Sequence, residues 1–441
     1  MRLMLGDTGR KPAMQFRVAI LVVLCFACQL AATVFPSDAQ PDMWQDTDDF
    51  ISPQPIEDPD GSAMRMFYAA LMRTDRAEES AITRIIHYGD SHVAADILTG
   101  ELSRKLKRGF GDSGPGYIFP VRPWSWYSRK DVESYESPGW SIEGLERRTS
   151  AMGKLLGMAG LSFTANQRGE RIRIRAFCKR FDLYLMKQPG GATVEISLDG
   201  EPYHSRVSLS ADNIEPGYLA VTAESEGAHS LELRTLSPGP ARIFGVVAES
   251  DSPGVVYDVF GLNGARASRP LEWDRNFLED NLNRRRPDLI IILYGSNEVG
   301  DADLDLTSYE RDFSTLLATL RNAAPAASLL VISPPDRAVL TSAGWRTISR
   351  LPGLVVAQRR AALAQGAAFW DLFKAMGSGG SINRWAVRSP PLAQSDRVHL
   401  TAQGYRTLAQ VLYRELMRGY VWALIASSKR KDERARLRDG G

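Results

Sequence analysis

The sequence predicts an α/β protein in which a parallel sheet carries helices on both faces and an antiparallel, jelly-roll-like β-sandwich interrupts the chain. Three observations support this fold class. A buried strand, a sharp turn and a helix follow one another within residues 82–108, short alternating runs fill residues 161–249, and strands alternate with helices again after Pro253. Strands that alternate with helices pair in parallel, and their helices then cover both faces of the sheet.

The first of these units ends its strand in a serine. Ile82 to Tyr88 is a short apolar run, Gly89-Asp90-Ser91 follows directly, and Val93 to Lys107 has apolar residues at helical spacing. Ser91 would thus stand at a helix N-terminus, where unpaired N–H groups and a partial positive charge face a developing anion. Ser91 is therefore a candidate nucleophile, and the alternative is an ordinary helix N-cap.

The middle of the chain has the period of β-strands. Runs such as 171–175, 193–198 and 230–234 alternate apolar with polar residues, and Gly, Pro, Asn and Asp separate them. Roughly seven or eight strands at this spacing indicate a β-sandwich. We expect it to be an inserted domain over residues 146–252, which could be structural or could bind a polymer.

After the insert the α/β pattern resumes, so the main domain is expected to comprise residues 61–145 and 253–420. A charged tail over residues 421–441 would follow it. The expected strands are 255–260, 289–293, 328–333 and 367–370, and the expected helices are 271–285, 309–322, 348–365 and 401–418.

The N-terminus resembles an export signal. Arg10, Lys11 and Arg17 precede an apolar run over residues 18–35, and small residues reach Ala39. This pattern predicts a signal peptide over residues 1–39 that is cleaved near Ala39.

The alternative is an uncleaved anchor, because the apolar run is near the lower length limit for a membrane span. Lipidation of Cys28 is less favoured, since Cys25 stands where a leucine is expected. In either case the body is exported, to the periplasm or to the outer face of the inner membrane. Membrane contact would then be made only by an uncleaved N-terminal segment, and residues 40–60, rich in Asp and Pro, would form a flexible spacer.

The composition excludes several classes of protein. The formal net charge of +2 gives no sign of nucleic-acid binding. Cys178 is the only cysteine outside the N-terminal segment, so an internal disulfide is excluded. Five histidines without a cysteine cluster argue against a zinc site. We expect no metal, no cofactor and a monomer.

Polar or glycine residues follow several of the expected strands, and ligands bind at this edge of an open α/β sheet. A serine nucleophile also needs a base, which must be held in one tautomer. His399 remains when histidines of the insert, of the first strand and next to Ser91 are set aside, and Asp396 could orient it. The alternative for His399 is an ordinary histidine at a helix start. The histidines set aside are His87, His92, His204 and His229.

The oxyanion formed when Ser91 attacks a carbonyl needs preorganised donors. The backbone N–H groups of Ser91 and Gly264 and the side-chain amide of Asn297 could face one point. With Asp396 and His399 as the fourth, these features stand in sequence order at four strand ends, which is hard to obtain by chance.

These four segments resemble the motifs of the SGNH hydrolases, also called GDSL esterases, which have a flavodoxin-like sheet. The resemblance implies that Ser91 is the nucleophile, that His399 is the base and Asp396 its orienting acid, and that Gly264 and Asn297 complete the oxyanion hole with Ser91. Two residues depart from the family pattern, because His92 replaces the usual Leu and Glu298 replaces the usual Asp. The matching segments are Gly89-Asp90-Ser91, Asn263-Gly264, Gly295-Ser296-Asn297-Glu298 and Asp396 to His399.

Gly-Asp-Ser-His together with an inserted β-sandwich is similar to the exported peptidoglycan O-acetylesterases, whose insert resembles a carbohydrate-binding module. This resemblance implies a serine esterase that removes O-acetyl groups from a cell-envelope polysaccharide, with peptidoglycan favoured, through an acetyl-enzyme. Three alternatives stay open: an O-acetyltransferase with the same triad, a catalytically silent polysaccharide-binding protein, and a lipid or arylester hydrolase. The aromatic residues Trp124, Trp126, Tyr127 and Trp140 could stack on sugars or seal a domain junction.

Overall fold

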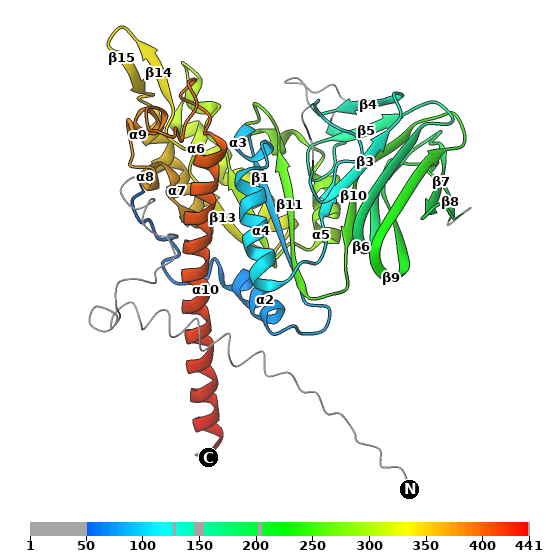
Figure 1. The fold of residues 1–441 in the computed structure, drawn as a ribbon, viewed down its shortest axis with the longest axis horizontal. Helices are drawn as coiled ribbons and strands as arrows, with labels where there is room; N and C mark the ends of the chain where they lie inside the picture. The colour runs from blue at the N-terminus through cyan, green and yellow to red at the C-terminus, as the bar shows by residue number, and fades with distance from the viewer. Residues whose placement is uncertain (1–50, 126, 128, 145–153, 202–204, 440–441) are drawn as a thin grey trace. The chain divides into compact units, whose positions relative to one another are not determined.

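The computed structural model describes residues 51–439 except 126, 128, 145–153 and 202–204, and side chains as far as Lys429 (Figure 1). The predicted signal peptide, Trp126 and His204 lie outside the described residues. None of the helices in the described part contains an apolar stretch long enough to span a membrane.

The centre of the α/β part is a five-stranded sheet in which every pair of neighbours is parallel, which confirms the predicted fold class. Its strands are almost entirely buried, because helices cover both faces. In spatial order they are β11 (Gly254–Gly261), β1 (Ile82–Gly89), β12 (Leu289–Leu293), β13 (Ser328–Ile332) and β16 (Ala368–Trp370).

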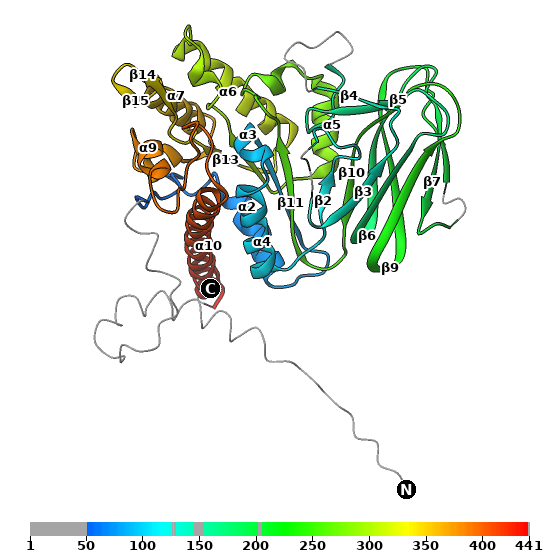
Figure 2. The same cartoon turned by 45° about the horizontal axis from the view of Figure 1, so that its top comes forward.

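Successive strand residues point to opposite faces. A group of helices covers each face of the sheet (Figures 1 and 2). Ile85 and Ile291 pack with leucines of α2 (Arg65–Asp75), α4 (Leu98–Phe110) and α10 (Ala402–Asp439). Their neighbours Ile86 and Ile292 pack on the other face. The helices of that face are α5 (Arg275–Arg285), α6 (Leu306–Ala323) and α7 (Leu351–Ala364).

Three sequence predictions about local structure are wrong. The expected helix over 93–107 is broken into α3 (Ser91–Ala94) and α4, because Asp96 adopts a left-handed φ of 50°. The last helix does not end at Arg418 but continues to Asp439, through most of the predicted tail. The spacer is attached at its end, since Glu57 exchanges two backbone hydrogen bonds with Phe369 of β16.

A second sheet is antiparallel and has nine strands, which is compatible with an inserted domain. Strand pairing joins all nine strands in one sheet, and the two-layer sandwich stays a prediction. Three of its strands precede residue 146, the predicted start of the insert. Its strands are β2 (Gly116–Ile118), β3 (Val132–Glu136), β4 (Trp140–Glu143), β5 (Ser162–Ala165), β6 (Arg171–Lys187), β7 (Thr193–Leu198), β8 (Ser205–Ser208), β9 (Glu215–Thr235) and β10 (Ala241–Glu249).

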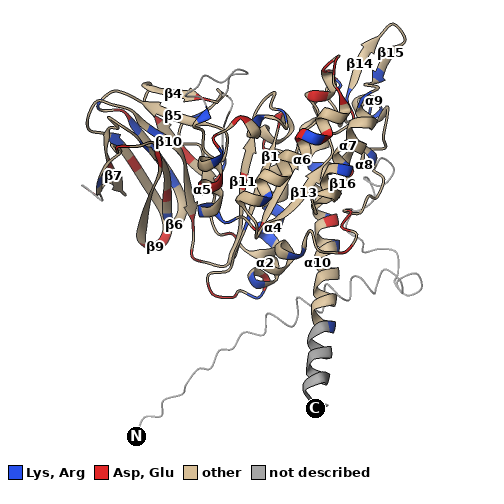
Figure 3. Ribbon diagram, turned by 180° about the vertical axis from the view of Figure 1, so that it is seen from behind, with Lys and Arg blue, Asp and Glu red and all other residues tan. Residues whose placement is uncertain are grey.

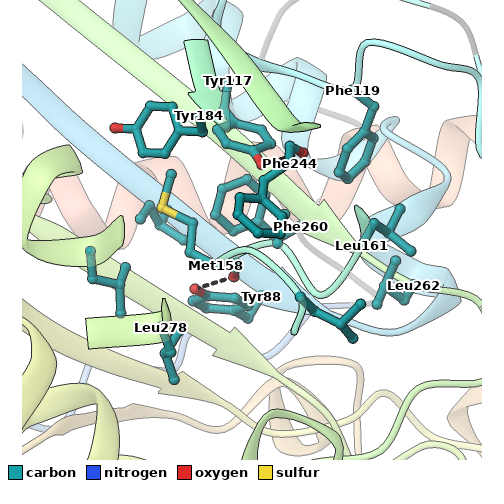
Figure 4. Packing of buried hydrophobic residues seen from close by; sticks show 14 of the residues in the cluster. Tyr88, Tyr117, Phe119, Met158, Leu161, Tyr184, Phe244, Phe260, Leu262 and Leu278 are labelled. Atoms are coloured by element: carbon teal, nitrogen blue, oxygen red, sulfur yellow. Dashed lines mark hydrogen bonds between the residues drawn. The ribbon is translucent and has the colours of Figure 1, made fainter. Parts of the chain in front are cut away.

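One apolar core joins the two sheets. Tyr117 of β2 packs against Phe260 of β11 with ring centroids 4.9 Å apart, and the hydroxyl of Tyr88 donates to the backbone oxygen of Met158 at 2.7 Å (Figure 4). The second half of β6 is buried on both faces there, whereas its first half alternates between buried and exposed residues. The antiparallel sheet is therefore packed firmly onto the α/β part.

A buried ionic cluster lies at the same junction. Arg285 of α5 donates to Asp258 and Glu249, and Arg84 of β1 donates to both oxygens of Glu249 at 2.9 and 2.8 Å. Burial opposes ionisation of Glu249, but Arg285 and Arg84 outweigh it and lower its pKa to about 2. Elsewhere, acidic and basic residues are interspersed along the chain (Figure 3).

Candidate active site

The turn after β1 brings three strand ends together. Gly89 is in register with Gly261 of β11 and with Leu293 of β12, so the chain segments that leave these strands start at one edge of the sheet. A Cβ atom on Gly89 would lie 2.3 Å from Val93 and 2.7 Å from the Leu293 oxygen, so no larger residue fits this turn. Ser91, Gly264 and Asn297 follow these three strand ends.

Ser91 is the first residue of α3, and Asp90 is the helix cap. The side-chain oxygen Oδ1 of Asp90 accepts a hydrogen bond from the His92 N–H at 3.0 Å. The alternative that Ser91 serves as the cap is therefore not what the structure contains. Its hydroxyl points instead to a histidine from the far end of the chain.

Ser91, His399 and Asp396 form a continuous hydrogen-bonded chain. Ser91 Oγ lies 3.0 Å from His399 Nε2, and His399 Nδ1 lies 2.7 Å from Asp396 Oδ2. The other oxygen of Asp396 accepts from the N–H groups of Val398 and His399, each at 3.0 Å. Burial alone would raise the pKa of Asp396, but these hydrogen bonds lower it, so the carboxylate stays ionised beside the imidazole.

A hairpin supports the loop that carries Asp396 and His399. Its strands are β14 (Ala338–Thr341) and β15 (Gly344–Thr347), and the Ala338 N–H donates to the Arg397 oxygen at 3.0 Å. The Arg397 guanidinium lies over the Trp345 ring, 5.4 Å from its centroid. We did not predict this hairpin, although two short runs around Ser342-Ala343-Gly344 are a weak signal for it.

His92 lies next to the proposed base, but its Nδ1 contacts another residue. That nitrogen is 2.8 Å from the Tyr405 hydroxyl of α10. The centroid of the His92 ring is 5.6 Å from the centroid of the His399 ring. Burial lowers the pKa of His92 to about 3, so this ring is neutral. The expectation that His92 does not serve as the base agrees with these contacts.

The three candidate oxyanion donors lie on adjoining segments. Within the described part of the chain, the N–H groups of Ser91 and Gly264 have no hydrogen-bond acceptor. Gly264 adopts a φ of 71°, and the space that its Cβ would occupy is open. The Asn297 amide donates one hydrogen to the Ala265 oxygen at 2.8 Å, which leaves its second N–H available.

A cavity of about 340 Å³ lies beside these segments. Residues that follow Gly264 and Asn297 line it, among them Arg266, Ala267, Glu298 and Asp301. In the described residues, no group of three or more His, Cys, Asp or Glu side chains is arranged to hold a metal ion.

The aromatic residues noted in the sequence pack inward where they are described. Trp124 and Tyr127 pack edge to face at 5.8 Å against the main core, and Trp140 is 8% exposed and donates its Nε1–H to the Arg171 oxygen. These contacts favour the sealing of a junction over sugar stacking.

Comparison with protein families matches part of this chain to a family model. Residues 226–407 match the model of the GDSL-like Lipase/Acylhydrolase family. The matched stretch contains Gly264, Asn297, Asp396 and His399, whereas Ser91 precedes it. Comparison with curated protein sequences gave no match.

Solved structures give a similarity of fold. A structure of a peptidoglycan O-acetylesterase matches with a TM-score of 0.69 and 23% identity, over 81% of this chain and 96% of that one. A family two carbohydrate esterase from Cellvibrio japonicus matches with a TM-score of 0.28 and 13% identity, over 66% of this chain and 98% of that one. An acetylxylan esterase from Geobacillus stearothermophilus matches with a TM-score of 0.29 and 20% identity, over 37% of this chain and 72% of that one.

The last two TM-scores are below 0.5, so only the first structure supports the assignment of the fold. The family match and this fold agree with the resemblance found in the sequence motifs. The chain therefore contains a GDSL-like lipase/acylhydrolase domain, with the fold seen in a peptidoglycan O-acetylesterase, and is a carboxylic ester hydrolase.

Proposed function

We propose that this chain is a serine O-acetylesterase that removes acetyl groups from a cell-envelope polysaccharide, in the first place peptidoglycan. The observation that carries the proposal is the hydrogen-bonded chain from Ser91 through His399 to Asp396. Such a chain is the arrangement that activates a serine hydroxyl, because a histidine held in one tautomer can accept its proton.

The proposed reaction has two steps. His399 takes the Ser91 proton while Oγ attacks the acetyl carbonyl, and the oxyanion is stabilised by the N–H groups of Ser91 and Gly264 and by the Asn297 amide. His399 then gives the proton to the leaving sugar oxygen, so that an acetyl-enzyme and a free sugar hydroxyl result. Water activated by His399 attacks the acetyl-enzyme, and acetate and Ser91 are released.

Three observations support a polysaccharide substrate. The fold resembles that of a peptidoglycan O-acetylesterase over 81% of this chain and 96% of that one. The antiparallel sheet is a candidate polymer-binding module, and the N-terminal sequence has the pattern of an export signal. We infer a periplasmic monomer, or a protein anchored at the outer face of the inner membrane if the signal is not cleaved.

The experiment is acetate release from O-acetylated peptidoglycan by wild type and Ser91→Ala. Ser210→Ala, which changes an exposed serine two residues after β8, is the matched control. We expect release by wild type and the control only, and none from peptidoglycan whose acetyl groups were removed by base beforehand.

Each other outcome identifies a different function. Cleavage of p-nitrophenyl acetate without release from peptidoglycan would retain the serine esterase and reject the substrate. Acetyl transfer to an added sugar without free acetate would indicate the O-acetyltransferase. Polysaccharide binding without turnover of any ester would indicate the silent binding protein.

A further inference from the structure

Two hydrogen bonds join the loop that follows β11 to the segment that follows β12. The Asn297 side-chain amide donates to the Ala265 oxygen at 2.8 Å, and the Ala267 N–H donates to Glu298 Oε1 at 2.7 Å. The two bonds run in opposite directions, and they hold the loop at both sides of Arg266. Gly264, the proposed oxyanion donor, directly precedes this bonded stretch.

The bond to Glu298 lies in the interior. Glu298 is 5% exposed, and burial raises the pKa of its carboxyl group. A buried carboxyl group is unfavourable unless hydrogen bonds satisfy it. The Ala267 N–H is one group that does so, which makes the side chain and the loop depend on each other.

A third contact between the two segments is weaker. Arg266 forms a two-pronged ion pair with Asp301, but the side chains are 41% and 32% exposed. Solvent screens such a pair, so it contributes little. The buried bond from Ala267 to Glu298 is therefore the contact that restrains this side of the loop.

Gly264 lies in a turn in which the Ala265 N–H donates to the Leu262 oxygen at 3.1 Å and the Leu262 N–H donates to the Gly89 oxygen at 3.0 Å. Its Cβ position has no neighbour within 4 Å, and its φ of 71° belongs to the left-handed region. The direction of the Gly264 N–H therefore depends on this turn and on where the chain that follows is fixed, at Ala265 and Ala267. A shift of about 1 Å at a reacting group can reduce a rate about 100-fold.

We propose that Glu298 is a positioning residue, which fixes the loop of Gly264 against Asn297 and thereby sets the geometry of the oxyanion donors. The inference rests on the proposed roles of Ser91, Gly264 and Asn297. Glu298 itself contacts no reacting atom.

The test compares Glu298→Met with Glu298→Gln. Methionine has a similar size but cannot accept the Ala267 N–H, whereas glutamine keeps an oxygen in this position. With p-nitrophenyl acetate, we expect Glu298→Met to lower kcat about 10- to 100-fold with KM within about threefold, and Glu298→Gln to stay within about threefold of wild type. Binding of a boronic acid, whose tetrahedral adduct carries an oxygen at the oxyanion position, should weaken in parallel with kcat/KM.

Asp288→Ala is the matched control for a merely structural effect. The Asp288 carboxylate accepts from the Arg84 N–H at 2.9 Å, at the opposite end of the same sheet. This variant should lose stability while kcat stays within about twofold of wild type.

Several results would overturn the inference. They are a kcat of Glu298→Met within twofold of wild type, an equal loss of kcat in Asp288→Ala, and a loss of more than tenfold in Glu298→Gln. A loss of more than tenfold in Glu298→Gln would reject the proposed role of Glu298 even if Glu298→Met does not fold. Ser91→Ala in the same assay separates the two proposals, because full turnover by that variant would reject the catalytic site itself.

Discussion

The Oγ of Ser91 lies 3.0 Å from Nε2 of His399, although 308 positions separate the two residues in the sequence. The contact depends on β1, which lies between β11 and β12 and so inserts an early strand into the later part of the fold. The nucleophile and its proposed base are thus brought together by the tertiary fold and not by their places in the sequence.

Asp396→Asn is expected to lower kcat about 10,000-fold with the fold retained, because an amide favours the wrong tautomer of His399. Single-turnover release of p-nitrophenol measures the effect. The control is Asp199→Asn, since Asp199 makes an equivalent 2.7 Å contact with Nδ1 of His229 in the antiparallel sheet. Equal losses in both variants would contradict a role specific to Asp396.

Asn297→Ala is expected to lower kcat about 100-fold or more, because it removes one proposed oxyanion donor. KM should change little, since the donor acts mainly on the transition state. Steady-state kinetics with p-nitrophenyl acetate separate the two constants. A raised KM with an unchanged kcat would show that Asn297 only binds the ground state.

The stability of wild type relative to Asp90→Asn should fall as pH rises from 5 to 8. Burial raises the pKa of Asp90 from 3.8 to about 7, so between these values the folded protein binds a proton that the unfolded chain has lost. Stability from this group is complete below pH 3.8 and decreases by up to about 1.4 kcal/mol for each pH unit up to about 7.

Urea unfolding at pH 5 and pH 8 measures this difference. The comparison with Asp90→Asn removes the other titrating groups, such as His92, whose lowered pKa of about 3 gives a slope of opposite sign between pH 3 and 6.5. Equal pH dependence in the two proteins would mean that Asp90 ionises normally.

Arg285→Ala is expected to destabilise the protein by about 3–5 kcal/mol, because it leaves Asp258 and Glu249 buried without their main partner. The free energy of unfolding in urea measures the effect. Arg275→Ala, on the same helix, breaks an exposed pair with Glu279 and should cost about 0–1 kcal/mol. Similar losses in both would contradict the burial argument.

The sequence by itself determined the fold class and the candidate residues. Buried strands of a parallel sheet are continuous apolar runs, so residues 289–293 were predicted with the bounds that β12 has. Ser91, Gly264 and Asn297 could be proposed together because each follows a predicted strand end, and His399 because the other histidines had less suitable positions. These signals are local, since they depend on residue type and on spacing over a few positions.

Only the tertiary structure decided which side chains meet. The bonds from His92 to Tyr405 and from Ala267 to Glu298 join segments that have no common pattern in the sequence. The break at Asp96 and the attachment of Glu57 to β16 likewise arise from contacts that spacing does not encode. A hydrogen bond between distant segments depends on the order and register of the strands. The periodicity of residues along one segment carries no information about either, so such a bond cannot be predicted from it.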